Sequence, residues 1–152
     1  MDAPDLQEIY HYRDLSPDLA GSGQPSADQL KAIAAHGFEV VINLAMPDDT
    51  RALPDEQRIV ETLGMVYEPI PVVWAAPTPG DLTAFLAAMD RHAGRKVWVH
   101  CVANFRASAF VMLYRVLRLD WSLAAALPDL QAIWQPNPTW QAFIDQAPAG
   151  GR

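Results

Sequence analysis

Cysteine and positive charge are both scarce in this chain of 152 residues. It has a single cysteine, Cys101, and 11 Lys and Arg against 18 Asp and Glu. One cysteine excludes an internal disulfide framework. The formal net charge of −7 argues against partners such as nucleic acid or an anionic membrane, because these polyanions are bound by clustered Lys and Arg. An anionic ligand therefore requires a local site that attracts it.

Long apolar runs and targeting signals are also missing. Pro, Gly or a charged residue interrupts every candidate for a membrane span. The opening MDAPDLQEIYHYRD has neither the basic nor the apolar region of a signal peptide, so we expect a cytoplasmic protein. Hydrophobic residues make up 51% and charged residues 19%, which is a globular balance. We predict one packed domain over residues 1–146, followed by a disordered tail at 147–152.

What the chain does contain is a regular alternation of helical and strand-like segments. Residues 26–37 form a predicted helix in which Ser26 and Gln29 can make a capping box. The same periodicity predicts further helices at 54–64, 78–94, 107–120, 122–134 and 137–146, and strands at 38–44 and 96–100. The segment 65–72 is strand-like up to its prolines. Strands alternating with long helices indicate an α/β fold with a mainly parallel sheet flanked by helices.

The stretch VWVHCVANFRAS, residues 97–108, runs from a predicted strand into a predicted helix. In parallel sheets, ligands bind beyond the carboxyl ends of strands, where helix N-termini present free N–H groups. A helix N-terminus and a nearby cation both lower the pKa of a thiol. Cys101 is therefore a candidate nucleophile, and the guanidinium of Arg106 a candidate ligand of an oxyanion. The alternative for Cys101 is an inert buried thiol.

Other residues of this stretch have predicted roles around the anion. Ser108 could donate to the cysteine sulfur or bond to its own helix, and His100 is expected to orient the loop by hydrogen bonds. The remaining histidines lack ligand spacing with His100 or Cys101, so we expect no metal and no cofactor. Asn104 suits a turn with positive φ. The main chain expected to bind the anion is that of Val102, Ala103, Asn104, Phe105 and Ala107.

The pair His100-Cys101, the loop after it, Arg106 and Ser108 resemble the phosphate-binding loop of the cysteine-dependent protein tyrosine and dual-specificity phosphatases. The segments SGQPS, GFEVVINL and YEPIPV occur in that family's order, and small bacterial members are most similar. The resemblance implies a three-layer sandwich with four or five strands, and a phosphorylated protein or small molecule as substrate. It also implies phosphate or sulfate binding in the pocket and a phosphocysteine intermediate.

Two features depart from that family's pattern. Four residues separate Cys101 from Arg106, whereas the family has five, and Asn104 replaces a glycine. The loop at 72–76, where the family carries its general acid, has no carboxylate. The remaining candidates for the acid are Asp81, Asp48 and Asp49, although Asp81 also suits the first turn of a helix.

Three functions remain open, and we predict the first. It is a phosphatase that hydrolyses phosphate monoesters, either phosphotyrosine-like or small aryl phosphates. The second is a sulfurtransferase resembling rhodanese, whose loop does place four residues between Cys and Arg. The third is an inactive phosphate-binding module.

Around the site, Trp74 is expected at the pocket rim and Gln24 on a nearby loop, whereas Trp98, Trp134 and Trp140 are expected in the core.

Overall fold

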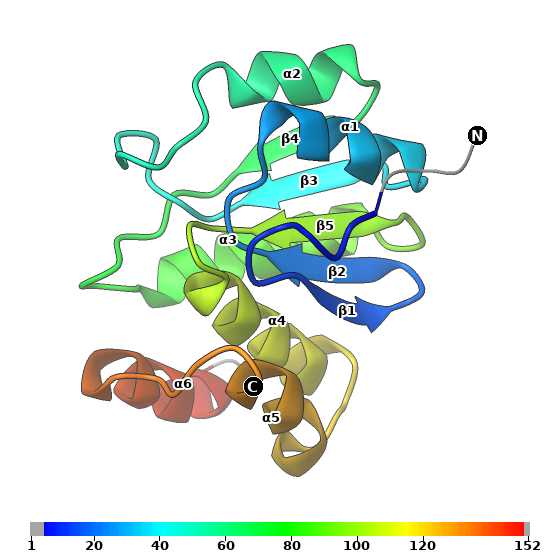
Figure 1. Cartoon of the computed structure of the whole chain (residues 1–152). Helices are drawn as coiled ribbons and strands as arrows, with labels where there is room; N and C mark the ends of the chain where they lie inside the picture. Colours follow the sequence, from blue (N-terminus) through cyan, green and yellow to red (C-terminus); the bar gives the residue numbers. More distant parts are fainter. Residues whose placement is uncertain (1–4, 151–152) are drawn as a thin grey trace.

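The computed structural model describes residues 5–150 and has a five-stranded sheet at its centre (Figure 1). The strand order is β1-β2-β5-β3-β4, and only the edge pair β1–β2 is antiparallel. The strands are β1 (Arg13–Ser16), β2 (Leu19–Ser22), β3 (Val40–Asn43), β4 (Val66–Pro69) and β5 (Val97–His100). The predicted α/β class with a mainly parallel sheet is confirmed.

Residues 5–150 form six helices, of which four cover the two faces of this sheet (Figure 1). The six are α1 (Ala27–Ala35), α2 (Glu56–Thr62), α3 (Pro79–Arg91), α4 (Phe105–Arg118), α5 (Leu123–Gln131) and α6 (Pro138–Gly150). Figure 1 shows α1 and α2 on one face and α3 and α4 on the other, with α5 and α6 outside α4. The arrangement is the three-layer sandwich that the resemblance implied.

The core is divided by the alternation of side chains along the strands. Val40 and Ile42 of β3 belong to the cluster under α3 and α4, whereas Val41 between them belongs to the cluster under α1 and α2. Trp98 of β5 lies in the second cluster, between Val97 and Val99 of the first. Both sheet faces are buried because parallel strands need helical crossovers on their faces.

Local signals for helix starts are confirmed. Ser26 and Gln29 form the predicted capping box at α1, and Thr78 forms another with Asp81 at α3. No comparable local signal marks β1 and β2. Residues 19–22, LAGS, are too few to show a strand pattern, and they form β2 because they pair with β5.

The strand expected from residue 65 up to its prolines is β4, which ends at Pro69. One predicted helix end differs from the structure. Helix α6 runs to Gly150 and so includes 147–150 of the expected tail, while 151–152 lie outside the described residues. The domain boundary at 146 stays a prediction.

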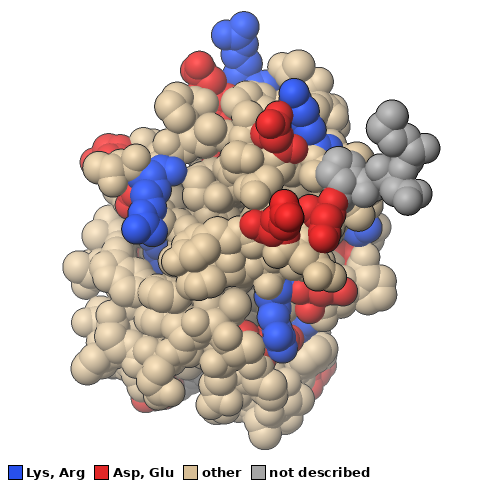
Figure 2. Space-filling view, viewed as in Figure 1, with Lys and Arg blue, Asp and Glu red and all other residues tan. Residues whose placement is uncertain are grey.

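Charged side chains of both signs are scattered over one face of the molecule (Figure 2). Figure 2 shows Lys and Arg side chains interspersed with Asp and Glu on the face drawn there, without a basic patch on that face. Within residues 5–150, none of the helices has the length and apolar character needed to cross a membrane.

Candidate active site

The stretch that begins at Cys101 lies at the carboxyl edge of the central strand. β5 is flanked by β2 and β3, both parallel to it, so the chain leaves the sheet at its middle before entering α4. Cys101 and His100 are fully buried there. The structure places Cys101 where the sequence predicted it, between a strand and a helix N-terminus.

Asn104 has the left-handed conformation expected for it, with φ of 67° and ψ of 6°. Its Nδ2 donates to the main-chain oxygen of His11 at 2.9 Å, and the ring Nδ1 of His11 lies 2.8 Å from the oxygen of Ala103. These two contacts tie the loop 101–105 to the N-terminal segment. They fix the turn that starts α4 at Phe105.

A second segment, Gly23–Gln24, holds the loop from β2. The N–H of Gln24 donates to the oxygen of Val102 at 2.9 Å, and the N–H of Gly23 donates to the oxygen of Tyr10 at 2.7 Å. A Cβ on Gly23 would lie 2.5 Å from the Val102 oxygen, so the close approach requires glycine. The loop that carries Gln24 therefore lies next to the cysteine loop, as predicted.

Arg106 is a buried cation beside the cysteine loop. It is 6% exposed, its Nη1 donates to the main-chain oxygen of Val72 at 2.8 Å, and its guanidinium lies 5.9 Å from the ring centre of Trp74. Among residues 5–150 it forms no ion pair. A buried charge without a counter-ion is costly, and a guanidinium has five donors. This arrangement is suited to an anion that the protein itself does not supply.

The N-terminus of α4 adds main-chain donors to that site. Phe105, Arg106 and Ala107 form the first turn of the helix, where N–H groups have no partner within the helix. The first hydrogen bond that closes a turn runs from the N–H of Ser108 to the oxygen of Asn104 at 2.9 Å. The helix dipole and these N–H groups favour negative charge at this end.

Ser108 shows the second of its two expected alternatives. Its hydroxyl donates to the main-chain oxygen of Phe105 at 3.0 Å and accepts from Nε1 of Trp134 at 3.1 Å. A hydroxyl has one proton to donate, and here that proton is directed to its own helix. Ser108 therefore links α4 to Trp134 in this state.

The three candidate acids lie in two different places. The carboxylate of Asp81 accepts from the N–H of Thr78 at 3.0 Å, as part of the cap of α3. Asp48 and Asp49 line a cavity of about 640 Å³ beyond β3 and β4, whose wall also includes Glu56. Asp48 is exposed and Asp49 half-buried.

Sequence reasoning missed Glu56, a buried carboxylate next to the site. Its Oε2 lies 2.6 Å from Nε2 of His100, and its Oε1 accepts from Nε2 of Gln24 at 2.6 Å. The other nitrogen of His100, Nδ1, lies 3.1 Å from the main-chain oxygen of Cys101. Acidic residues are common in the first turn of a helix and are usually exposed there. The position of Glu56 at the start of α2 therefore gave no indication that its side chain is buried.

Aromatic side chains form the outer rim. The ring of Phe105 is stacked on Trp134 with centroids 4.7 Å apart, and Trp74 lies 6.0 Å from Phe105. Trp74 is 39% exposed, which agrees with its predicted rim position. Trp98 and Trp140 are core residues as expected, but Trp134 is only half-buried. Trp134 packs against the edge of the core cluster instead of lying inside it.

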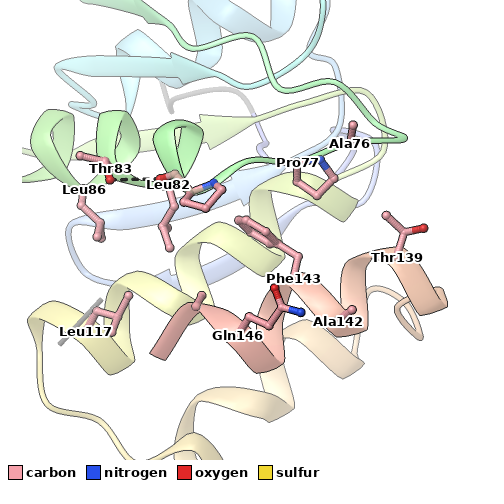
Figure 3. A pocket seen from close by; sticks show the side chains of 12 residues that line it. Ala76, Pro77, Leu82, Thr83, Leu86, Leu117, Thr139, Ala142, Phe143 and Gln146 are labelled. Carbon is pink, nitrogen blue, oxygen red and sulfur yellow. Dashed lines mark hydrogen bonds between the residues drawn. The ribbon is translucent and has the colours of Figure 1, made fainter. Parts of the chain in front are cut away.

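A separate apolar cavity of about 310 Å³ lies between α3 and α6. Figure 3 shows side chains of both helices, with Leu117, Ala76 and Pro77, around it. Its lining includes no residue of the stretch 97–108. This cavity is therefore distinct from the cysteine site.

Comparison with known proteins identifies the family. Residues 8–133 match the model of the DSP-PTPase phosphatase fused to NAD+ kinase. The chain belongs to this DSP-PTPase family. The resemblance found from His100, Cys101, Arg106 and Ser108 is thus confirmed.

Solved structures agree with this assignment. A DUF442 protein from Shewanella putrefaciens CN-32, whose phosphatase assignment is provisional, is 38% identical with a TM-score of 0.86, and the match covers 95% of each chain. The structure of Tk-PTP in its active form is 20% identical with a TM-score of 0.73, over 90% of this chain and 95% of that one. The second likeness concerns the fold alone.

Among curated proteins, this DSP-PTPase chain is 34% identical over 104 residues to the "Beta-lactamase hydrolase-like protein" of Xylella fastidiosa (strain Temecula1 / ATCC 700964). The match covers 66% of this chain and 23% of that protein. The chain thus spans less than a quarter of the curated relative.

Proposed function

We propose that this DSP-PTPase domain hydrolyses phosphate monoesters, phosphotyrosine-like or small aryl phosphates, through a phosphocysteine intermediate. The observation that carries the proposal is the buried guanidinium of Arg106, which has no carboxylate partner within residues 5–150 and lies at the helix end that follows Cys101. A dianionic phosphoryl group supplies the missing charge.

The proposed reaction has two steps. The thiolate of Cys101 attacks phosphorus, and the bond from phosphorus to the ester oxygen breaks as the leaving group departs with its electron pair. Water then attacks the thiophosphate, releasing inorganic phosphate and restoring the thiolate. Arg106 and the loop N–H groups stabilise the equatorial oxygens in both steps. These N–H groups belong to Val102, Ala103, Asn104, Phe105 and Ala107.

His100 and Ser108 complete the proposed catalytic set. His100 orients the loop through its contact with the oxygen of Cys101. Ser108 holds the start of α4 through Phe105 and Trp134.

The preference for aryl esters follows from the loop 72–76. This loop holds Arg106 through the oxygen of Val72 and carries no carboxylate. A general acid contributes about 10²–10⁴-fold to such reactions, and a phenolate leaves more readily without one than an alkoxide does. Asp48 and Asp49 remain the candidates on the cavity side, because the carboxylate of Asp81 is used by the cap of α3.

The test is the initial rate on para-nitrophenyl phosphate across pH, in a reducing buffer, for the wild type and Cys101→Ser. We expect turnover that is lost in the variant, while both proteins bind inorganic phosphate. Equal rates in the two proteins would refute the phosphocysteine mechanism. Phosphate binding without turnover on any ester would support a binding module instead.

A second candidate, sulfur transfer, is favoured by one observation: the four-residue spacing between Cys101 and Arg106. The Cys101 thiolate would attack the outer sulfur of thiosulfate, forming a persulfide and releasing sulfite. Cyanide would then take that sulfur as thiocyanate and restore the thiolate. A mass increase of one sulfur atom on Cys101 after thiosulfate treatment, together with thiocyanate formation, distinguishes this activity from phosphate hydrolysis.

A further inference from the structure

Glu56 has an unusual environment for an acidic residue at the start of a helix. It is 5% exposed, and both of its carboxylate oxygens have a polar partner: Nε2 of His100 at 2.6 Å and Nε2 of Gln24 at 2.6 Å. A buried carboxylate without such partners would be destabilising. Burying this carboxylate costs free energy, and the hydrogen-bond partners of Glu56 indicate its role.

Both ring nitrogens of His100 face oxygen atoms. Nδ1 lies 3.1 Å from the main-chain oxygen of Cys101, which can only accept, so Nδ1 carries a proton. Nε2 faces the carboxylate of Glu56. If that carboxylate is ionised, Nε2 must also carry a proton, and the ring is an imidazolium.

The state of Glu56 follows from its surroundings. Burial acts to raise its pKa, but the charge and hydrogen bond of His100, with hydrogen bonds from Gln24 and Tyr67, bring the pKa below its ordinary value. Glu56 is therefore an anion near neutral pH. With oxygen atoms facing both ring nitrogens of His100, the hydrogen bonds require a proton on each nitrogen.

We propose that Glu56 is a positioning residue for Cys101: it keeps His100 doubly protonated, so that the imidazolium holds the Cys101 carbonyl and stabilises the neighbouring thiolate. The pair is neutral in total, but its positive end is the member in contact with Cys101. An oriented dipole of this sign lowers the pKa of a thiol. The inference rests on the proposed role of Cys101 as a nucleophile.

The neighbours of the Glu56–His100 pair include neutral, cationic and acidic groups. From β4, Tyr67 has a pKa raised to about 12 by burial and by the charge of Glu56, so it is neutral over the working range. From β2 and β3, the residues paired with His100 are the neutral Ser22 and Asn43. Arg106 on α4 acts in the same direction as His100. The acidic residues that share the cavity wall with Glu56 are Asp48, Asp49 and Asp55.

The experiment is a pH titration of the thiolate, followed by its ultraviolet absorbance. Cys101 is the only cysteine, so subtracting the Cys101→Ser spectrum isolates its signal even though the side chain is buried. The variant is Glu56→Gln, which keeps the shape and removes the charge. The matched control is Glu61→Gln, an exposed position on the same helix.

In Glu56→Gln we expect His100 to become neutral and the pKa of Cys101 to rise by about one unit or more. The thiolate fraction below that pKa then falls about tenfold, while Glu61→Gln matches the wild type. A Glu56→Gln curve that superimposes on the wild type, or moves to lower pH, overturns the proposal.

A measurement on the unmodified protein covers the case in which Glu56→Gln fails to fold. Nitrogen-15 shifts of the His100 ring at neutral pH should show both nitrogens protonated, and a neutral ring overturns the proposal. Neither readout requires turnover. If the wild type has no phosphatase activity but Glu56→Gln still shifts the titration of the Cys101 thiol, the proposed function is refuted and the role of Glu56 is supported.

Discussion

Arg106 of α4 donates from Nη1 to the main-chain oxygen of Val72 at 2.8 Å, across 34 positions of sequence. Val72 begins the loop that lacks a carboxylate, and Trp74 of the same loop lies against the guanidinium. The loop therefore contributes to the site by orienting the arginine. Its own side chains bring no acid.

The first prediction concerns the planar shape of Arg106. Arg106→Lys keeps the charge but removes the fork that binds two oxyanion atoms at once. Hydrogen bonds to charged groups are worth about 1.5–3 kcal/mol, so vanadate or phosphate should bind about 10–100-fold more weakly. Isothermal titration calorimetry measures this.

The control for that variant is Arg118→Lys, at the exposed end of the same helix, where the arginine pairs with Asp90 at 3.2 Å. It should bind the anion like the wild type. An unchanged affinity in Arg106→Lys would place the anion elsewhere.

The second prediction concerns the space beside the loop. In Gly23→Ala, the new Cβ would lie 2.5 Å from the oxygen of Val102 and 2.7 Å from Cδ2 of Tyr10. The main-chain contact can be relieved only by moving the loop, so unfolding in urea should show a loss of about 1–3 kcal/mol. Gly80→Ala is the control, because its nearest neighbour is Thr78 Oγ1 at 3.7 Å. Equal stability of the two variants would contradict the prediction.

The third prediction separates two roles of Asn104, its left-handed conformation and its hydrogen bond to His11. Asn104→Gly loses the bond but tolerates φ of 67°, whereas Asn104→Ala loses the bond and adds strain. The left-handed region costs about 1–2 kcal/mol for a residue with a Cβ. Alanine should therefore be less stable than glycine by about 1 kcal/mol in urea unfolding. The opposite order would mean that the turn relaxes without strain.

The fourth prediction concerns stability in acid. Asp129 binds both Arg115, which is almost fully buried, and Arg13. Burial acts to raise the pKa of Asp129, but the hydrogen bonds and charges of Arg115 and Arg13 bring it below the ordinary value. Its contribution to stability is therefore complete above the pKa of the unfolded chain and is lost as the pH falls through the lower, folded pKa.

Asp129→Asn should lower the free energy of unfolding by about 1–3 kcal/mol at neutral pH, since it leaves Arg115 without its anion. Its loss of stability on acidification should be smaller than that of the wild type. Asp90→Asn, which breaks the exposed pair with Arg118, should change stability by less than about 1 kcal/mol. Denaturant unfolding at several pH values tests both, and parallel pH curves for Asp129→Asn and the wild type would contradict the assignment.

Much of the architecture was predictable because its signals are local. The capping box at Ser26 and the apolar periodicity of α3 and α4 depend on residues within one or two turns. The same holds for Asn104, whose short polar side chain tolerates positive φ. Placing Cys101 between a strand and a helix needed no more than this. The family resemblance came from residues 100–108 and the order of the surrounding segments.

The tertiary structure decided the contacts that join distant segments. Glu56 and His100 are 44 positions apart, and each has an ordinary local context. The strand β2 exists because β5 pairs with it, and Ser108 directs its proton to Phe105 because Trp134 occupies its other side. The sequence by itself determined which residues could do chemistry and on which elements they lie. Only packing decided which charges are buried together, since burial depends on residues that no local pattern brings near.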